Sequence, residues 1–112
     1  MRKAWFFLLL AFMALMSCGS REKVPKPEVL LTEAQMVDLL ADAYLVEADL
    51  NTRKTRGENV QSLQGAYYAQ IFEHYGITDS IFDQNMNYYS HDLVTLERIM
   101  DSVHQRFEKA KQ

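Results

Sequence analysis

The sequence predicts a small all-α domain, a bundle of about four helices, that follows an apolar amino-terminal segment and a short tether. Three observations support this fold class. Apolar residues recur at spacings of three and four in four separate stretches between residues 30 and 112. Polar or glycine-containing breaks divide these stretches, and no stretch alternates strictly between apolar and polar residues as a half-buried strand does. We therefore divide the chain into an apolar segment (1–17), a tether (18–29) and one helical domain (30–112).

The apolar segment has the layout of a secretory signal peptide. Arg2 and Lys3 supply positive charge at its start, and an uncharged run of 13 residues from Ala4 to Met16 follows. As a helix rising about 1.5 Å per residue, this run covers about 20 Å, less than the ~30 Å hydrocarbon core of a bilayer. The sequence therefore predicts a cleaved signal rather than a permanent membrane-spanning helix.

Cys18 is predicted to carry lipid. It follows Leu15, Met16 and Ser17 and precedes Gly19, which is the pattern of a lipobox. In that processing the sulfur receives a diacylglyceryl group, and cleavage before the cysteine frees its amine for a further acyl chain. Two or more acyl chains anchor a protein stably, whereas one anchors it only marginally and reversibly. The alternative interpretation is an ordinary secretory signal with a chance cysteine.

The predicted processing limits the chemistry of the remaining chain. Cleavage before Cys18 removes 17 of the 112 residues and leaves 95, and loss of Arg2 and Lys3 changes the net charge from −3 to −5. Because Cys18 is the only cysteine, its lipidation excludes disulfides, thiolate metal sites and cysteine catalysis within a monomer. The acidic balance argues against nucleic acid as the main partner. We expect no cofactor and no bound metal.

The tether separates the predicted anchor from the helical domain. Residues 19–28 are polar, include Pro25 and Pro27, and show no apolar period. Near the polyproline rise of ~3.1 Å per residue, such a segment reaches up to about 30 Å. Residue 19 is not an aspartate and no dense acidic run follows Cys18. We therefore expect attachment to the outer membrane, facing the periplasm, rather than display on the cell surface.

The first helix is expected from Glu33 to about Asn51, because Thr32 and Gln35 can form a capping box at its start. The polar, glycine-containing segment 51–59 is predicted as a loop. Residues expected on or beside the apolar face of this helix include Met36, Leu40, Tyr44 and Leu50.

Three further helices follow. The second fits residues 60–75, and Gly76 after it suits the left-handed position that ends many helices. Thr78 is expected to cap a short third helix, and Ser90 a fourth that runs to about Lys109. The residues of the fourth helix that are expected to face the core are Leu93, Leu96, Met100, Val103 and Phe107.

Two carboxylates on the first helix, Asp38 and Asp42, form a candidate polar site. They lie four residues apart and so near one another on the helix surface. Together with a histidine, such a pair could serve acid–base catalysis, or it could bind a hard cation. The simpler interpretation is the solvated face of an amphipathic helix, with Asp42 partly buried. His74, His91 and His104 form no metal-binding signature.

Two pairs of adjacent tyrosines, Tyr67–Tyr68 and Tyr88–Tyr89, are the candidate partner-binding residues. Both members of a pair cannot face one core, so we expect one of each at the rim or on the surface. Tyrosine combines apolar area with a polar tip and is enriched in binding surfaces. The alternative is that these tyrosines belong to the core and extend their hydroxyls to solvent.

Several segments form a recognisable set. They are the lipobox at Cys18, the proline-containing tether, the stretches Met36–Ala48 (MVDLLADAYLVEA) and His74–Thr78 (HYGIT), Phe82, and Tyr88–Tyr89. Together they resemble a family of small lipoproteins from the Bacteroidetes group, the domain of unknown function 4296. The resemblance covers about residues 28–107. It implies a helical lipoprotein linked to the outer membrane, and it implies no activity or site residues.

These observations support three hypotheses. The first is a membrane-anchored, non-catalytic module that binds an envelope protein or peptide through the paired tyrosines. The second is an enzyme or small-ligand-binding domain that uses Asp38, Asp42 and a histidine. The third is a structural subunit of an envelope complex. In all three, the lipid on Cys18 makes the membrane a partner.

Overall fold

The computed structural model describes residue 3 and residues 23–112, so Cys18 and the rest of the expected signal peptide fall outside the described residues. Four helices follow in order: α2 (Glu33–Thr55), α3 (Gln61–Tyr75), α4 (Asp79–Ser90) and α5 (Leu93–Ala110). The part of the chain that the structure describes contains no strand. The predicted small all-α bundle of four helices is confirmed.

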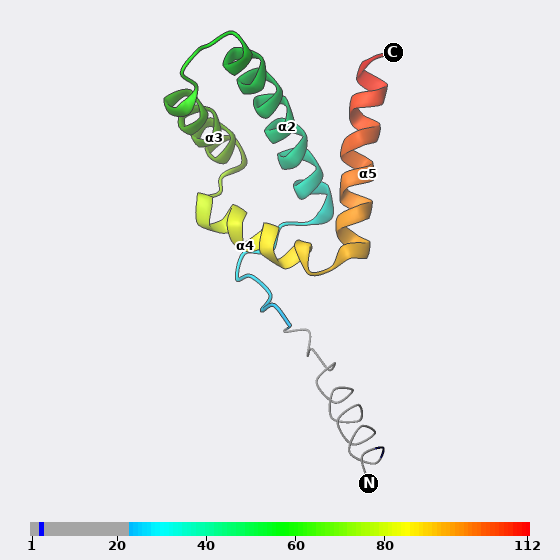
Figure 1. Ribbon diagram of the computed structural model, residues 1–112. Helices are drawn as coiled ribbons and strands as arrows, with labels where there is room; N and C mark the ends of the chain where they lie inside the picture. The colour runs from blue at the N-terminus through cyan, green and yellow to red at the C-terminus, as the bar shows by residue number, and fades with distance from the viewer. Residues whose placement is uncertain (1–2, 4–22) are drawn as a thin grey trace.

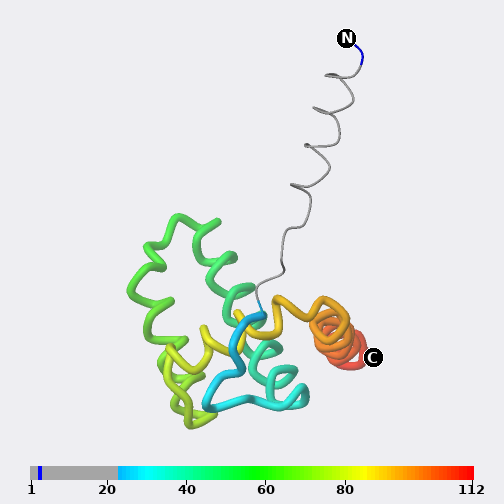
Figure 2. Tube along the Cα trace, turned by 90° about the horizontal axis from the view of Figure 1, so that it is seen from below, coloured from blue at the N-terminus to red at the C-terminus, as the bar shows by residue number. Residues whose placement is uncertain are grey.

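The long helix α2 is the centre of the arrangement (Figure 1). It packs against α3 on one side and α5 on the other, and α4 contacts α5. Figure 1 shows α4 lying across one end of the other three helices, and Figure 2 views the molecule from that end. The turn between α2 and α3 and the last residue of the chain lie at the opposite end.

Local capping explains where three of the helices begin or end. At the start of α2, the Thr32 hydroxyl accepts a hydrogen bond from the Gln35 amide at 3.1 Å, and the Gln35 side chain accepts one from the Thr32 amide at 2.8 Å. This confirms the predicted capping box. Gly76 ends α3 with φ of 64°, the left-handed conformation that glycine adopts at least cost. The Thr78 hydroxyl caps α4 as predicted.

The predicted end of the first helix is wrong, because α2 continues through residues 51–55. The hydroxyls of Thr52 and Thr55 donate to carbonyls one turn back, at 3.0 and 2.9 Å. Arg53 also pairs with Asp49 one turn back at 2.8 Å. The ion pair supports the helix here and the threonine hydroxyls are satisfied within it, where the composition indicated a loop. The loop shrinks to residues 56–60, and α3 begins at Gln61.

Ser90 was also the wrong cap for the fourth helix. It is the last residue of α4, and its hydroxyl donates to the Asn87 carbonyl at 2.8 Å. Asp92 caps α5 instead, because its carboxylate accepts the amide of Thr95 at 3.2 Å. The later start leaves Leu93 as the first residue of α5, where it is 71% exposed rather than in the core as expected.

The core lies mainly between α2 and α5. Met36 and Leu39 of α2 are buried against a cluster that includes Ile99 and Val103 of α5. Ile71 of α3 and Tyr89 of α4 belong to the same cluster. Tyr44, expected beside the apolar face, is 48% exposed and meets Phe107 of α5 edge to face at 6.4 Å between ring centroids.

A buried amide ties the chain ahead of α2 to α4. Asn85 is fully buried, and its side-chain oxygen accepts the amide of Leu31 at 2.8 Å. Its side-chain nitrogen donates to the carbonyls of Val29 and Ile81, both at 2.8 Å. The Tyr89 hydroxyl donates to the Leu31 carbonyl. The last residue of the expected tether, Val29, is therefore tied to the folded domain.

Candidate functional site

The packing of α3 on α2 is organised by tyrosines that bind carboxylates. Three tyrosine hydroxyls of α3 donate hydrogen bonds to three acidic side chains of α2. The pairs are Tyr67–Asp49 at 2.9 Å, Tyr68–Glu47 at 2.6 Å and Tyr75–Asp42 at 2.5 Å. The helices run antiparallel, so the earliest tyrosine meets the latest carboxylate (Figure 1). We call these six residues the tyrosine–carboxylate seam.

The seam favours protonated tyrosine hydroxyls and, at Asp49, a charged carboxylate. Burial and the hydrogen bond to Glu47 raise the pKa of Tyr68 to about 12. Burial and the hydrogen bond to Asp42 raise the pKa of Tyr75 to about 12. Each hydroxyl therefore stays protonated near neutral pH and continues to donate. Hydrogen bonds from Arg53 and then Tyr67 lower the pKa of Asp49, which favours its charged, accepting form.

The four candidate tyrosines lie in two places rather than one. Tyr67 and Tyr68 are half-buried along the seam. Tyr88 is half-buried and packs edge to face on Tyr89, with ring centroids 5.3 Å apart. Tyr89 is only 6% exposed, so its ring offers a partner little surface. Tyr68 reaches α4 through Phe72, which stacks at a tilt on Phe82.

The candidate carboxylates Asp38 and Asp42 bind different neighbours. Asp38 forms an ion pair with Arg106 of α5 at 2.5 Å, with about half of each side chain exposed. Asp42 is half-buried, as expected, and accepts the Tyr75 hydroxyl of α3. The two residues thus tie α2 to the helix on each side of it. His74, His91 and His104 are exposed. Within residues 23–112, no three His, Cys, Asp or Glu side chains gather closely enough to hold a metal ion.

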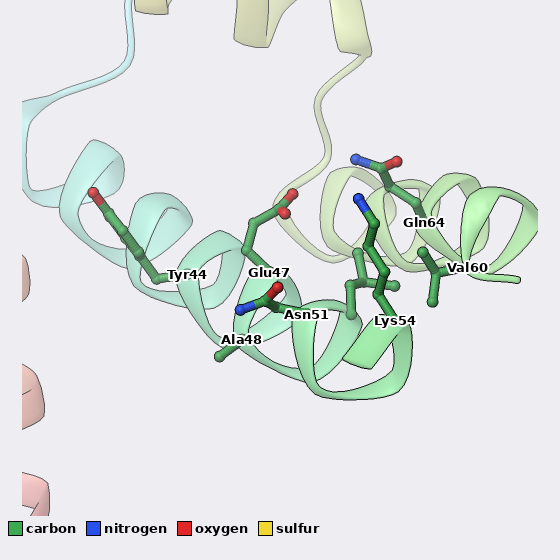
Figure 3. Close-up of a pocket in the computed structure, with 8 residues that line it drawn as sticks. Tyr44, Glu47, Ala48, Asn51, Lys54, Val60 and Gln64 are labelled. Atoms are coloured by element: carbon green, nitrogen blue, oxygen red, sulfur yellow. The ribbon is translucent and has the colours of Figure 1, made fainter. Parts of the chain in front are cut away.

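An open groove of about 520 Å³ runs along the second half of α2 and the start of α3 (Figure 3). We call it the α2–α3 groove. Figure 3 shows Glu47, Lys54 and Gln64 extending toward the same space between the two helices. Its full lining combines apolar and polar side chains: Tyr44, Glu47, Ala48, Leu50, Asn51, Lys54, Val60 and Gln64.

The seam supports one wall of the α2–α3 groove. Glu47 belongs to both, because its carboxylate accepts the Tyr68 hydroxyl and also lines the groove. Tyr44, Ala48 and Asn51 follow one another at helical spacing along α2. The groove therefore presents an ordered stripe on α2 and an acidic group that α3 holds in place.

Sequence reasoning missed the α2–α3 groove for an identifiable reason. Lys54 is one of its lining residues, and the prediction placed residues 51–59 in a loop. Tyr44 had been assigned to the helix's apolar face. The sequence did contain a signal for this groove, because Tyr44, Ala48 and Asn51 are spaced to share one face of a helix. The pairing of Asp49 with Arg53 extends that helix to Lys54. A smaller groove of about 290 Å³ lies between α2 and α5, beside Val37 and Arg106.

The helices of the described residues include none that is both long enough and apolar enough to cross a bilayer. No curated protein and no solved structure matches the chain. A family model described as a domain of unknown function (DUF4296) matches residues 27–112, which is well over half of the sequence and includes all four helices. This match agrees with the resemblance seen in the sequence, and the chain belongs to the DUF4296 family.

Proposed function

We propose that this protein is a lipoprotein of the cell envelope, held by lipid on Cys18, whose helical domain binds a protein or peptide partner without catalysing a reaction. The lipobox sequence Leu15–Gly19 after a short apolar run supports the anchor. The absence of an aspartate at residue 19 favours the outer membrane, facing the periplasm.

The α2–α3 groove is the observation that carries the binding role. It is open along its length, and the exposed Tyr44 ring gives it an amphipathic aromatic side chain of the kind enriched at protein interfaces. Ala48 and Val60 add apolar side chains to the lining, over the buried Leu50. A partner side chain seated there would lose water from both its own surface and the Tyr44 ring.

The polar lining indicates what kind of segment fits. Glu47 is held by Tyr68 on one wall, and Lys54 lies two helical turns further along α2. Gln64 and Asn51 add amide groups that accept and donate hydrogen bonds. The complementary partner is a peptide segment with an apolar side chain flanked by a basic group that meets Glu47 and an acidic group that meets Lys54.

Site-specific photo-crosslinking in cells tests this proposal. A photoreactive amino acid at Ala48 places the reactive group in the groove, and we expect a discrete crosslinked envelope partner. Tyrosine is enriched among the interface residues whose truncation costs over 1 kcal/mol, and a loss of that size in Tyr44→Ala weakens binding by about five-fold or more. Lys54→Glu should also lower the yield by removing a complementary charge.

Leu45→Ala is the matched control, because Leu45 is 59% exposed on the same helix and does not line the groove. Circular dichroism of each variant checks that the helices are intact. A crosslink that Tyr44→Ala and Leu45→Ala reduce equally would place the partner elsewhere. The absence of any partner crosslink at Ala48, in a folded and membrane-bound protein, would reject the binding role of this groove.

A further inference from the structure

The point at which the tether leaves the domain is fixed by α4, not by the start of α2. Asn85 holds both the Val29 carbonyl and the Leu31 amide, and Tyr89 holds the Leu31 carbonyl. The chain is therefore held on α4 from Val29 onward. In Figure 1 this exit lies at the end of the domain where α4 and the turn into α5 are found. Figure 2, viewed from that end, shows the segment ahead of α2 crossing α4, with the start of α5 to one side.

Exposed aliphatic side chains occur on two elements at this end, the tether exit and the first turn of α5. Val29 is 47% exposed where the tether leaves, and Leu93 and Val94 are each 71% exposed in the first turn of α5. The other large apolar side chains that are prominently exposed among the described residues are Tyr44 and Leu45, halfway along α2. We call Val29, Leu93 and Val94 the tether-end patch.

We infer that the tether-end patch rests on the lipid surface to which the chain is anchored. This inference rests on the lipid anchor of the proposed function. With Val29 held on α4, residues 19–28 span at most about 30 Å, so this end of the domain stays near the bilayer. Such tethering gives even weak surface contacts a high effective concentration. Aliphatic side chains then enter the boundary between head groups and acyl chains.

The charges around the patch are compatible with a lipid surface. Lys23 and Lys26 are exposed in the tether and suit anionic head groups. Asp92 precedes Leu93, but its carboxylate accepts both the amide and the hydroxyl of Thr95, at 3.2 and 2.6 Å. That carboxylate therefore needs fewer water contacts when the surface approaches. Glu28, just ahead of the Asn85 contact, and Glu97, one helical turn after Leu93, are exposed acidic residues at this end.

This orientation has a consequence for the α2–α3 groove. The groove is built from the second half of α2 and the start of α3, whose connecting turn lies at the end of the domain away from α4 (Figure 1). A domain that rests on its tether-end patch turns the groove away from the bilayer. The site is then open to partners in the surrounding compartment.

Tryptophan quenching by brominated lipids tests the inference. The chain from Cys18 to Gln112 contains no tryptophan, and the buried core residues of the described part lie between Leu31 and Val103, so this chain keeps all of them. Its single thiol can be coupled to a maleimide lipid in vesicles of phosphatidylethanolamine and phosphatidylglycerol. The coupled Leu93→Trp protein should lose about half of its fluorescence when the vesicle lipids carry bromine, since interfacial residues sit about 5–10 Å deep.

Leu45→Trp is the matched control, because Leu45 is also exposed but lies halfway along α2. Its fluorescence should change little with brominated lipid. A Val29→Trp reporter should be quenched as Leu93→Trp is, and adding Leu93→Asp and Val94→Asp should abolish that quenching. Equal quenching of the Leu93→Trp and Leu45→Trp proteins, or none in either, would overturn the inference. Either result would show that the tether-end patch does not dock on the bilayer.

The chemical coupling separates this inference from the lipid-anchor proposal. Coupling through Cys18 supplies an anchor whether or not cells attach lipid there, so quenching reports only on how the domain sits. Labelling of cells with radioactive palmitate reports only on the natural anchor. A labelled Cys18 without quenching of Leu93→Trp would reject the docked orientation alone, and quenching without cellular labelling would reject the anchor alone.

Discussion

Replacement of Asn85 by alanine should destabilise the domain more than almost any other single polar change. The Asn85 side chain is fully buried and makes three hydrogen bonds of 2.8 Å, two of them to the backbone of Val29 and Leu31. Alanine would leave the Leu31 amide and the Val29 carbonyl without these partners. A buried polar group that loses its partner costs about 1–3 kcal/mol. We therefore expect a loss of about 3 kcal/mol in the free energy of unfolding.

That loss is large for a domain of this size. At roughly 0.1 kcal/mol per residue, the four-helix domain would have a total stability of about 8 kcal/mol. Urea denaturation followed by circular dichroism measures the change in the free energy of unfolding. If the dependence of this free energy on urea concentration is unchanged, two-state unfolding describes both proteins. Hydrogen exchange supplies a local measure, since the Leu31 amide should lose its protection in Asn85→Ala.

Gln84→Ala is the matched control for this measurement. Gln84 is the neighbouring residue on α4, is exposed, and contacts only Ser80 through a long side-chain hydrogen bond of 3.3 Å. Its replacement should change the free energy of unfolding by less than about 0.5 kcal/mol. If Asn85→Ala were as mild as Gln84→Ala, and the Leu31 amide stayed protected, the contact of the tether with α4 would be refuted.

Three further predictions follow from the seam, the glycines and the anchor. The pKa values of Tyr68 and Tyr75 rise from 10 to about 12 on folding, so their contribution to stability is complete below pH 10 and is lost as the pH rises through 12. Alkaline urea titrations should show this loss in the unmodified protein and a smaller one in Tyr68→Phe/Tyr75→Phe. Gly76→Ala should cost about 1 kcal/mol because φ is 64° there, whereas Gly65→Ala, inside α3 with open space around it, should add about 0.5–1 kcal/mol by the same urea assay. Cys18→Ser should abolish incorporation of labelled palmitate and release the protein from the membrane fraction, and a variant that stayed labelled would contradict the assignment of Cys18.

The features that sequence reasoning predicted depend on residues close together in the chain. The Thr32–Gln35 capping box, the Thr78 cap and the left-handed Gly76 each involve contacts within about one helical turn. Ser90 and Asp92 are both good capping residues two positions apart, and the sequence offered no local reason to choose between them. In the structure Tyr89 packs into the core, and the turn that contains Tyr89 and Ser90 belongs to α4. The cap of α5 is therefore Asp92.

The candidate site depends on pairings that no local pattern reveals. Tyr67 and Asp49 are 18 residues apart, and Tyr75 and Asp42 are 33 apart. The sequence showed both an excess of tyrosine and a row of carboxylates, but it treated them as separate features. The structure joins them because antiparallel packing of α3 on α2 brings the two rows into register. Asn85 was missed for the same reason, since its partner Leu31 is 54 residues away.

The hydrogen bonds from α4 to Val29 and Leu31 also determine which part of the domain first resists a pull on the tether. A pull on the tether reaches the Val29 carbonyl and the two backbone groups of Leu31 before it reaches the Thr32 cap of α2. The two bonds of Leu31 are buried and that of Val29 is part-buried, so water competes poorly for the Leu31 groups in particular. Load is therefore passed to α4, and through its contact with α5 to the core between α2 and α5. The contacts of α4 thus take up the pull ahead of the first turn of α2, and the groove at the far end keeps its shape.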